Sequence, residues 1–273
     1  MFMDPAEAKF LLAVAATSCA CHTLLLILWR RFAHVVVPAL LASRSSDDKI
    51  YIENSFVTLF GVSLFAPAFA IRAILGTNMS SPLASPTSSA IVAEGISLGY
   101  MIYDLVWMLY HPEHDAKARP IMLFHHILSI IGFPYAILRH RAVPFVLFFI
   151  ATEVTGILQH ARMLLLKFGL DHTHIYLVVG LSWTLSFFAV RALPAPFLIM
   201  AQLQDADAWA SYSAFDYWLS VTTLPLPFLL NAYWLYLLVA GAVKALRKQQ
   251  TGPSPQSQDY GQLVEPPVTG EAT

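Results

Sequence analysis

Residues 100–110 read YMIYDLVWMLY and residues 120–138 read PIMLFHHILSIIGFPYAIL, and these two stretches decide the fold. Both are mostly apolar, but they carry Asp104 and the adjacent pair His125 and His126. Ionisable groups in hydrocarbon are costly and usually face a protein interior or a water-filled cavity. The pattern therefore predicts membrane-spanning helices that hold a polar centre between them.

The composition supports a polytopic membrane protein. The 273 residues are 57% hydrophobic and only 12% charged, about half the charged fraction of an average soluble domain. The formal net charge of -1, without a basic patch interleaved with aromatics, excludes nucleic acid binding. Cys19 and Cys21 lie inside an apolar run, where they are read as small packing residues.

Apolar runs along the whole chain are long enough to cross the roughly 30 Å hydrocarbon core as helices. These runs are residues 10–29, 51–75, 91–110, 120–138, 143–166, 175–200 and 218–243. Backbone groups find no water in the membrane, so spanning segments must be helices or closed barrels. The alternating pattern of a barrel strand is missing from the sequence. We therefore expect an all-α polytopic bundle of about seven transmembrane helices.

The runs also suggest how the chain is divided. Residues 1–50 are expected to form an N-terminal transmembrane helix and a cytosolic loop. Residues 51–248 form one membrane domain. Residues 249–273 are polar, contain several Pro and Gly, and lack an apolar period, so we expect a disordered tail.

Positive charges in the loops predict the orientation. Loops 76–90 and 201–217 contain no Lys or Arg. The remaining ends and loops carry Arg30, Arg31, Arg44, Lys49, Lys117, Arg119, Arg162, Lys167, Lys244, Arg247 and Lys248. The positive-inside rule then predicts a lumenal N-terminus and a cytosolic C-terminus. The basic turn at Arg139 and Arg141 is the exception, because this alternation makes it lumenal.

Several polar side chains are predicted to lie at similar depth. A rise of 1.5 Å per residue places them within about 6–9 Å of the cytosolic edge, with one more about 20 Å from it. The shallow group is Asp104, His125, His126, His160 and Arg162, and the deeper residue is Glu153. Two antiparallel neighbouring helices would let Asp104 contact the histidine pair. Arg191 is also deep and needs a partner, for which Glu153 is the candidate.

Such a layer fits a cytosol-facing polar cavity. A histidine takes a proton from an attacking amine or hydroxyl near neutral pH, and Asp104 would orient that imidazole. Arg162 would hold a phosphate or stabilise an oxyanion. The alternative is that these groups pair with one another and only fix the packing of the helices.

The order of these motifs resembles the TLC (TRAM/LAG/CLN) domain family across residues 51–248. The matching residues are Tyr103-Asp104, then after about twenty residues His125-His126, and finally Glu153-Val154-Thr155. The resemblance implies an endoplasmic reticulum or related membrane, and a six-helix barrel around a lipid-accepting cavity. In ceramide synthases of this family the histidine pair is catalytic, with acyl-CoA as donor and a sphingoid amine as acceptor.

Carried over to this sequence, the resemblance implies that His125, His126 and Asp104 are catalytic. It leaves Tyr103, Glu153, His160 and Arg162 as substrate-binding candidates. Ceramide synthases have an acidic His-Asp…Asp pattern in the next helix, where this chain has Glu153, Thr155, His160 and Arg162. The chain therefore looks closer to the small TLC domain-containing proteins.

Two functions follow as expectations. One is membrane-lipid metabolism or homeostasis, with sphingolipids and ceramide as the candidate lipid class and acyl transfer from acyl-CoA as the candidate reaction. The other is non-enzymatic binding, transport or regulation of membrane lipid. No cofactor or metal is expected in either case.

Three other membrane classes fit the sequence poorly. A seven-helix receptor lacks its cysteine pair and its acidic-Arg-Tyr motif here. A retinal pump needs a lysine in the middle of the last helix, but Lys244 lies at its end. A di-iron enzyme needs more histidines at metal-ligand spacing than this chain has. The candidates would be His111, His114, His125, His126, His172 and His174.

Overall fold

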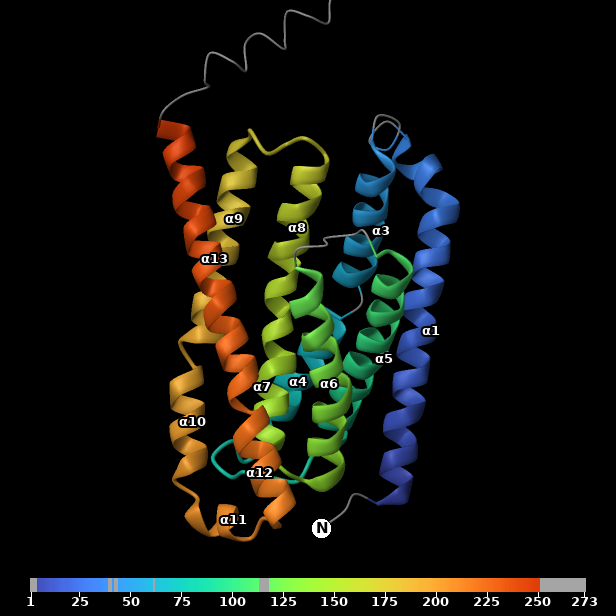
Figure 1. Ribbon diagram of the computed structural model, residues 1–273. Coiled ribbons are helices and arrows are strands. Elements are labelled where there is room, and N and C mark those ends of the chain that lie inside the picture. Colours follow the sequence, from blue (N-terminus) through green and yellow to red (C-terminus); the bar gives the residue numbers. More distant parts are fainter. Residues whose placement is uncertain (1–3, 39–40, 42–43, 61, 113–117, 251–273) are drawn as a thin grey trace, which may run out of the picture.

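A computed structural model describes residues 4–38, 41, 44–60, 62–112 and 118–250 (Figure 1). These residues form helices and contain no strand, which confirms the all-α prediction. Of the tail expected to be disordered, residues 251–273 lie outside the described part, and so does His114.

The long helices run along a common direction, and the short α11 (Ala206–Ala210) lies across it (Figure 1). In chain order they are α1 (Pro5–Val36), α3 (Ser46–Phe60), α4 (Phe65–Leu75), α5 (Ser88–Tyr110), α6 (Arg119–Arg139), α7 (Val143–Thr152), η1 (Glu153–Thr155), α8 (Gly156–Lys167), α9 (His174–Phe187), η2 (Phe188–Ala192), α10 (Ala195–Leu203), α11 (Ala206–Ala210), α12 (Ala214–Thr223) and α13 (Pro225–Gln250). Within the described residues, six helical stretches are long and apolar enough to cross a membrane. They are Pro5–Val35, Ser88–Tyr110, Arg119–Arg139, Val143–Lys167, His174–Leu203 and Ala214–Lys244.

The apolar run 51–75, expected as one helix, is two helices instead. α3 ends at Phe60 and α4 begins at Phe65. Pro67 in the first turn of α4 has no N–H, and its ring would clash with the carbonyl of residue 63 in a continuous helix. Together α3 and α4 still run from one end of the molecule towards the other (Figure 1). Counting them as one crossing agrees with the expected seven.

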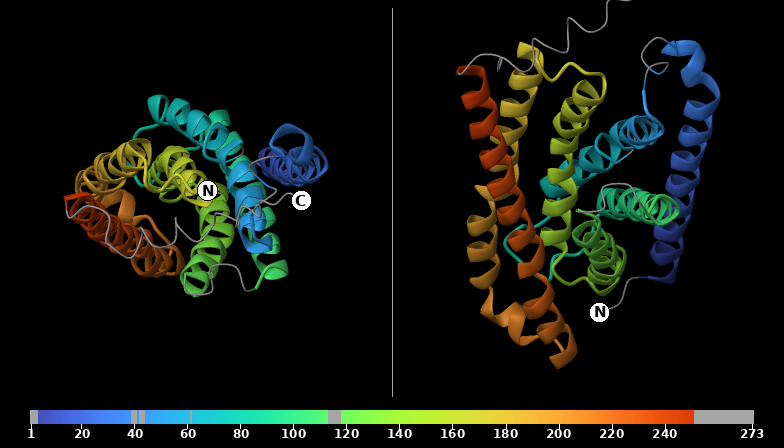
Figure 2. Two further views of the ribbon diagram at one scale, coloured as in Figure 1. Left: turned by 90° about the horizontal axis from the view of Figure 1, so that it is seen from above. Right: turned by 45° about the horizontal axis from the view of Figure 1, so that its top comes forward.

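Seen from above, the helices after α1 surround a common centre, and α1 packs outside them (Figure 2). Around this centre, α3 contacts α8, α4 and α6 contact α5, and α9 contacts both α8 and α13. The rings of His125 on α6 and Trp234 on α13 lie 5.6 Å apart and join those two helices. This arrangement agrees with the six-helix barrel that the family resemblance implies.

Two glycines let α1 approach α5 closely. A Cβ on Gly95 would lie 2.7 Å from Val14 Cβ, and one on Gly99 would lie 2.6 Å from Ser18 Cβ. Ser18 Oγ also donates a hydrogen bond to Ile96 O over 2.9 Å. Small residues four apart are common where transmembrane helices pack, because they bring the backbones together.

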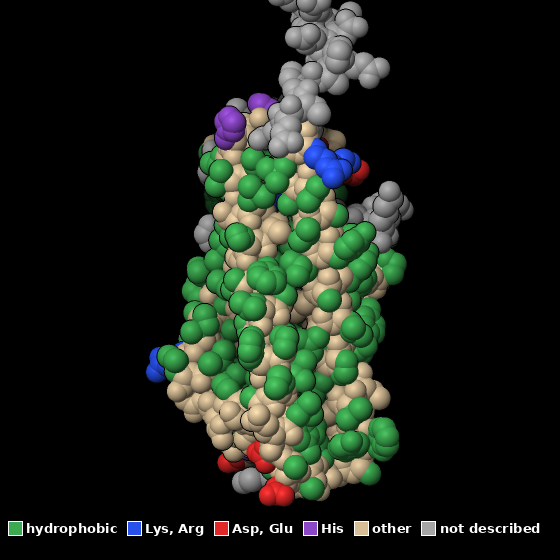
Figure 3. Space-filling view, turned by 90° about the vertical axis from the view of Figure 1, so that its left-hand side faces the viewer, with side chains coloured by type: hydrophobic (Ala, Val, Ile, Leu, Met, Phe, Trp, Pro, Cys, Tyr) green, Lys and Arg blue, Asp and Glu red, His purple; other side chains and the backbone are tan. Residues whose placement is uncertain are grey.

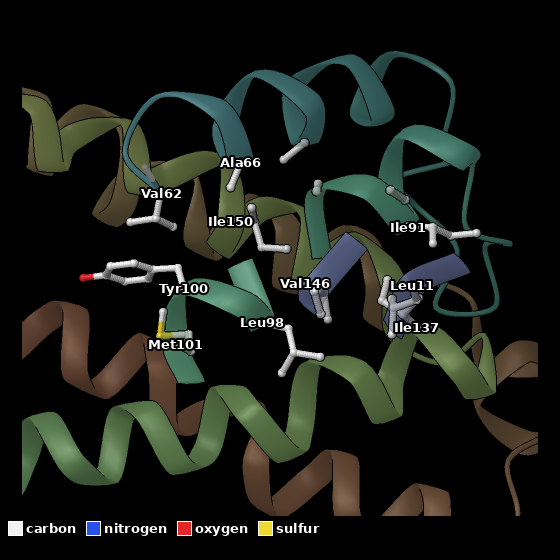
Figure 4. Close-up of a cluster of buried hydrophobic side chains, with 14 of the residues drawn as sticks. Leu11, Val62, Ala66, Ile91, Leu98, Tyr100, Met101, Ile137, Val146 and Ile150 are labelled. Atoms are coloured by element: carbon white, nitrogen blue, oxygen red, sulfur yellow. The ribbon is translucent and has the colours of Figure 1, made fainter. Parts of the chain in front are cut away.

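A cluster of buried apolar side chains sits around α5 (Figure 4). It includes Leu11 from α1, Ala66 from α4, Tyr100 from α5, Ile137 from α6 and Val146 from α7. Burial of these side chains anchors α5 between its neighbours. Asp104 therefore lies on a helix that this cluster holds in place.

The opposite side of the molecule is apolar on its surface. Figure 3 shows hydrophobic side chains spread over the face that α9, α10 and α13 build, with most charged side chains near its two ends. Phe197, Met200 and Tyr236 are among the exposed apolar side chains there. A surface of this kind suits contact with lipid tails.

The basic turn at Arg139 and Arg141, which departs from the positive-inside pattern, lies beside the buried carboxylate of Asp216. Asp216 on α12 is 1% exposed, and its Oδ2 lies 3.1 Å from Arg139 Nη2 and 3.7 Å from Arg141 Nε. Tyr135 OH donates to the same carboxylate over 2.6 Å. Asp216 balances the two arginines locally, but the positive-inside rule counts Lys and Arg whatever their acidic neighbours, so this turn still departs from the predicted orientation.

Candidate functional site

The predicted contact between Asp104 and the histidine pair is present, and it is made by His126. Asp104 Oδ2 on α5 lies 2.9 Å from His126 Nε2 on α6, and both side chains are buried. The two groups face each other as an ion pair, without the alignment of a good hydrogen bond. Asn54 Nδ2 on α3 donates to Asp104 Oδ1 over 3.0 Å. Three helices thus converge on one carboxylate.

The second ring nitrogen of His126 is also engaged. His126 Nδ1 lies 2.8 Å from Met122 O, one helical turn earlier. A carbonyl oxygen only accepts hydrogen bonds, so Nδ1 must carry a proton. With a carboxylate at the other nitrogen, His126 and Asp104 hold a further proton between them. His126 is therefore fixed in place and poorly suited to take a proton from a substrate.

His125 points into a different environment. Its ring meets those of His126 and Trp234 edge-on, with centroids 5.4 and 5.6 Å away. It lines a cavity of about 20 Å³ together with Glu153, Arg191 and Asn231, which is room for about one water molecule. No side-chain hydrogen bond occupies the His125 ring within the described part of the chain. Within the pair, His125 is thus the histidine whose ring nitrogens remain available to accept a proton.

An ion pair forms the polar wall of this cavity. Arg191 Nη2 lies 3.1 Å from Glu153 Oε1, and Arg191 Nε donates to Thr155 Oγ1 over 3.0 Å. The partner predicted for Arg191 is thereby confirmed. Both members sit in irregular turns, since η1 is a 3₁₀ turn and η2 a π-helical turn. Such turns within long helices often mark functional sites.

The other three predicted site residues, Tyr103, His160 and Arg162, do not line the cavity at His125. Tyr103 is buried and stacks on His22 of α1 at 5.6 Å, so it faces the outer helix. His160 on α8 is half-buried, and its Nδ1 lacks a hydrogen-bond partner among the described residues. Arg162 packs on α9 instead, with its guanidinium 4.7 Å from the ring centroid of Tyr176.

Sequence reasoning overlooked two residues that complete the site. Asn54 was hidden in an apolar run, although an amide inside a transmembrane helix usually bonds across helices. Trp234 was read only as part of the last span. Among the described residues, no three His, Cys, Asp or Glu side chains come close enough to hold a metal ion.

Comparison with known sequences places the chain in a family. The sequence model of the TLC domain matches residues 51–240. The chain belongs to the TLC domain family. The TLC match begins within α3 and ends within α13, so it covers the helices around the common centre and leaves out α1. With its apolar helices, this TLC protein is a multi-pass integral membrane protein.

A curated relative belongs to the small TLC proteins. TLC domain-containing protein 4 A of Dictyostelium discoideum is 22% identical over 133 residues, which is 48% of this chain and 51% of that protein. The match thus spans about half the length of the relative. It supports the expected likeness to small TLC domain-containing proteins rather than to ceramide synthases.

Proposed function

We propose that this TLC protein acts in membrane-lipid metabolism or homeostasis, and that His125 is the group that meets the lipid. One observation carries the proposal. Asp104 and Met122 contact both nitrogens of His126, whereas the neighbouring imidazole of His125 lines a cavity beside Glu153 and Arg191. In this arrangement His125 can act as the general base, and His126 packs beside it in a fixed position.

The chemistry we propose is acyl transfer from acyl-CoA. His125 takes the proton of an amine or hydroxyl on the acceptor lipid as that group attacks the thioester carbonyl. The carbon–sulfur bond then breaks, and the departing thiolate receives the proton from His125. Asp104, held by Asn54, acts as a positioning residue through His126. Our topology prediction puts this site near the cytosolic side of the endoplasmic reticulum membrane, where soluble acyl-CoA has access.

Non-enzymatic lipid binding, transport or regulation is the second candidate, and a groove favours it. The groove lies between α10 and α13, measures about 690 Å³ and is lined mainly by apolar side chains such as Ile199 and Phe228. It shares Arg191 and Asn231 with the cavity at His125. A lipid tail would fit the groove with its polar end towards Arg191, whereas the cavity itself holds only about one water molecule.

Whole-cell lipid profiles test the proposal. Wild type and the double variant His125→Ala/His126→Ala are expressed at equal levels. A defined lipid class that changes only with wild type supports function at the histidine pair. Purified protein is then given acyl-CoA and candidate acceptors, and release of free CoA thiol is measured. Equal lipid changes in both proteins would refute the role of the pair and favour binding or regulation elsewhere in the molecule.

A further inference from the structure

Arg162 occupies a second cavity, separate from the one at His125. This cavity measures about 90 Å³ and lies between α8, α9 and α13. Its lining includes Arg162, Tyr176, Trp183, Thr184 and Gly241. A water molecule needs roughly 10–15 Å³ by this measure. The cavity therefore has room for several waters or for one group of phosphate size.

The charge of Arg162 is not balanced by a described acid. Several other cationic side chains form ion pairs across the molecule. These pairs are Arg30–Glu53, Arg139–Asp216, Arg141–Asp216, Lys167–Asp48 and Arg191–Glu153. Arg162 instead lies over aromatic rings, 4.7 Å from the centroid of Tyr176 and 5.8 Å from that of Trp183. Within the described residues its guanidinium thus keeps donors for an anion.

The backbone around Arg162 is shaped to leave space. A Cβ on Gly180 would lie 3.1 Å from Arg162 Nε, so the glycine lets the guanidinium pack against α9. A Cβ on Gly241 would meet nothing within 4 Å, which leaves the α13 side open. Trp183 Nε1 is buried and has no acceptor among the described residues. The cavity wall therefore offers an indole N–H in addition to the arginine.

Arg162 lies near one end of its helix. It lies five residues before Lys167, the last residue of α8, which is about 7.5 Å along the helix. Basic pockets between transmembrane helices near the membrane surface are known sites for phosphate-bearing lipid headgroups. Arginine is well suited to phosphate because its planar fork donates two parallel hydrogen bonds.

We propose that the Arg162 cavity binds a phosphate group at a site distinct from the His125 cavity. The phosphate belongs either to a membrane phospholipid or to a soluble phosphate ester such as CoA. The proposal does not depend on chemistry at His125. It also gives the Arg162 candidate a role although the guanidinium faces away from the histidine pair.

Binding measurements on the full purified chain in neutral detergent test this site. Three probes are titrated separately: short-chain phosphatidic acid, CoA and inorganic phosphate. Arg162→Gln should weaken the binding that wild type shows by at least about tenfold, the loss expected for charge-assisted hydrogen bonds. Arg162→Lys should keep part of it. Lys244→Gln, which removes an exposed charge from the same end of the molecule, should change it less than about twofold.

The pattern across the probes identifies the source of the phosphate. Binding of phosphatidic acid alone indicates a lipid headgroup, and binding of CoA indicates a soluble ester. Gly241→Leu fills the open side of the cavity and leaves the charge of Arg162 in place, and it should also weaken binding. This second variant tests the site even if Arg162→Gln does not fold. The binding measurement needs no turnover, so its result stands whether or not the proposed acyl transfer takes place. Absence of binding in wild type, or equal affinity in wild type and both blocking variants, would overturn the proposal.

Discussion

Asp104 Oδ2 lies 2.9 Å from His126 Nε2, and this buried ion pair joins α5 to α6 directly behind His125. Removing one charge should disturb the position of the neighbouring imidazole. We expect Asp104→Asn to lower the proposed acyl-transfer activity at least about tenfold, which corresponds to ~1.4 kcal/mol in the transition state. Folded protein should persist in size-exclusion chromatography. Asn54→Ala removes only one hydrogen bond to Asp104 and should cost less activity. Normal activity in Asp104→Asn would remove Asp104 from the site.

The Arg191–Glu153 ion pair should be worth more to folding than an exposed pair. Replacing only Glu153 by Gln leaves a mostly buried guanidinium without its counter-charge. We expect a loss of about 2–3 kcal/mol in the free energy of unfolding, less than for a fully buried pair because Glu153 is partly exposed. The double variant Glu153→Gln/Arg191→Met should recover part of this loss. Additive losses in a denaturant titration would show that the pair is not coupled.

Estimating the depth of each residue from the helical rise predicted both the Asp104–His126 and the Glu153–Arg191 contacts. This estimate works well for neighbouring antiparallel helices. Residues at equal height on adjacent helices meet when they also face each other. Height alone does not give the direction of a side chain, since each residue turns the helix by about 100°. His160 and Arg162 are two residues apart and therefore point to nearly opposite sides. For the same reason His126 faces α5 while His125 turns towards α13.

Other features needed contacts between segments distant in sequence. Nothing near Arg139 in the sequence reveals that Asp216, 77 residues later, lies beside it. The division of run 51–75 into two helices was also missed, although Pro67 was visible in the sequence. The all-α class and the spans required only apolar length and composition, which are local properties.

The close approach of α1 to α5 can be tested by comparing two glycine-to-alanine substitutions, one at this contact and one in open space. Gly99→Ala places a Cβ 2.6 Å from Ser18 Cβ, whereas Gly241→Ala meets open space. Overpacking at Gly99 should cost about 1–3 kcal/mol, and Gly241→Ala should be neutral or slightly stabilising because alanine favours helix. Thermal unfolding of the two variants in the same detergent measures the difference. Equal midpoints would argue against a tight α1–α5 contact.

A surface ion pair between α3 and α8 should make the stability of the folded protein depend on pH in the acidic range. Lys167 Nζ lies 2.7 Å from Asp48 Oδ1, and its hydrogen bond lowers the pKa of the Asp48 carboxyl. The contribution is therefore present above the pKa of the unfolded chain, about 3.9, and is lost as the pH falls through the lower folded value. Because the pair is partly exposed, it is worth less than about 1 kcal/mol. Between pH 5 and pH 3, the unfolding midpoint of wild type should fall slightly more than that of Asp48→Asn. Parallel pH profiles would contradict this role.

The most direct test of the account separates the two adjacent histidines. His125→Ala and His126→Ala are expressed singly, and the lipid profile and the thermal midpoint are measured for each. We predict that His125→Ala abolishes the lipid change with a midpoint close to wild type. His126→Ala should lower the midpoint by roughly 4 °C or more, because it leaves Asp104 buried without its counter-charge. A His125→Ala protein that still changes the lipid profile like wild type would contradict the central claim.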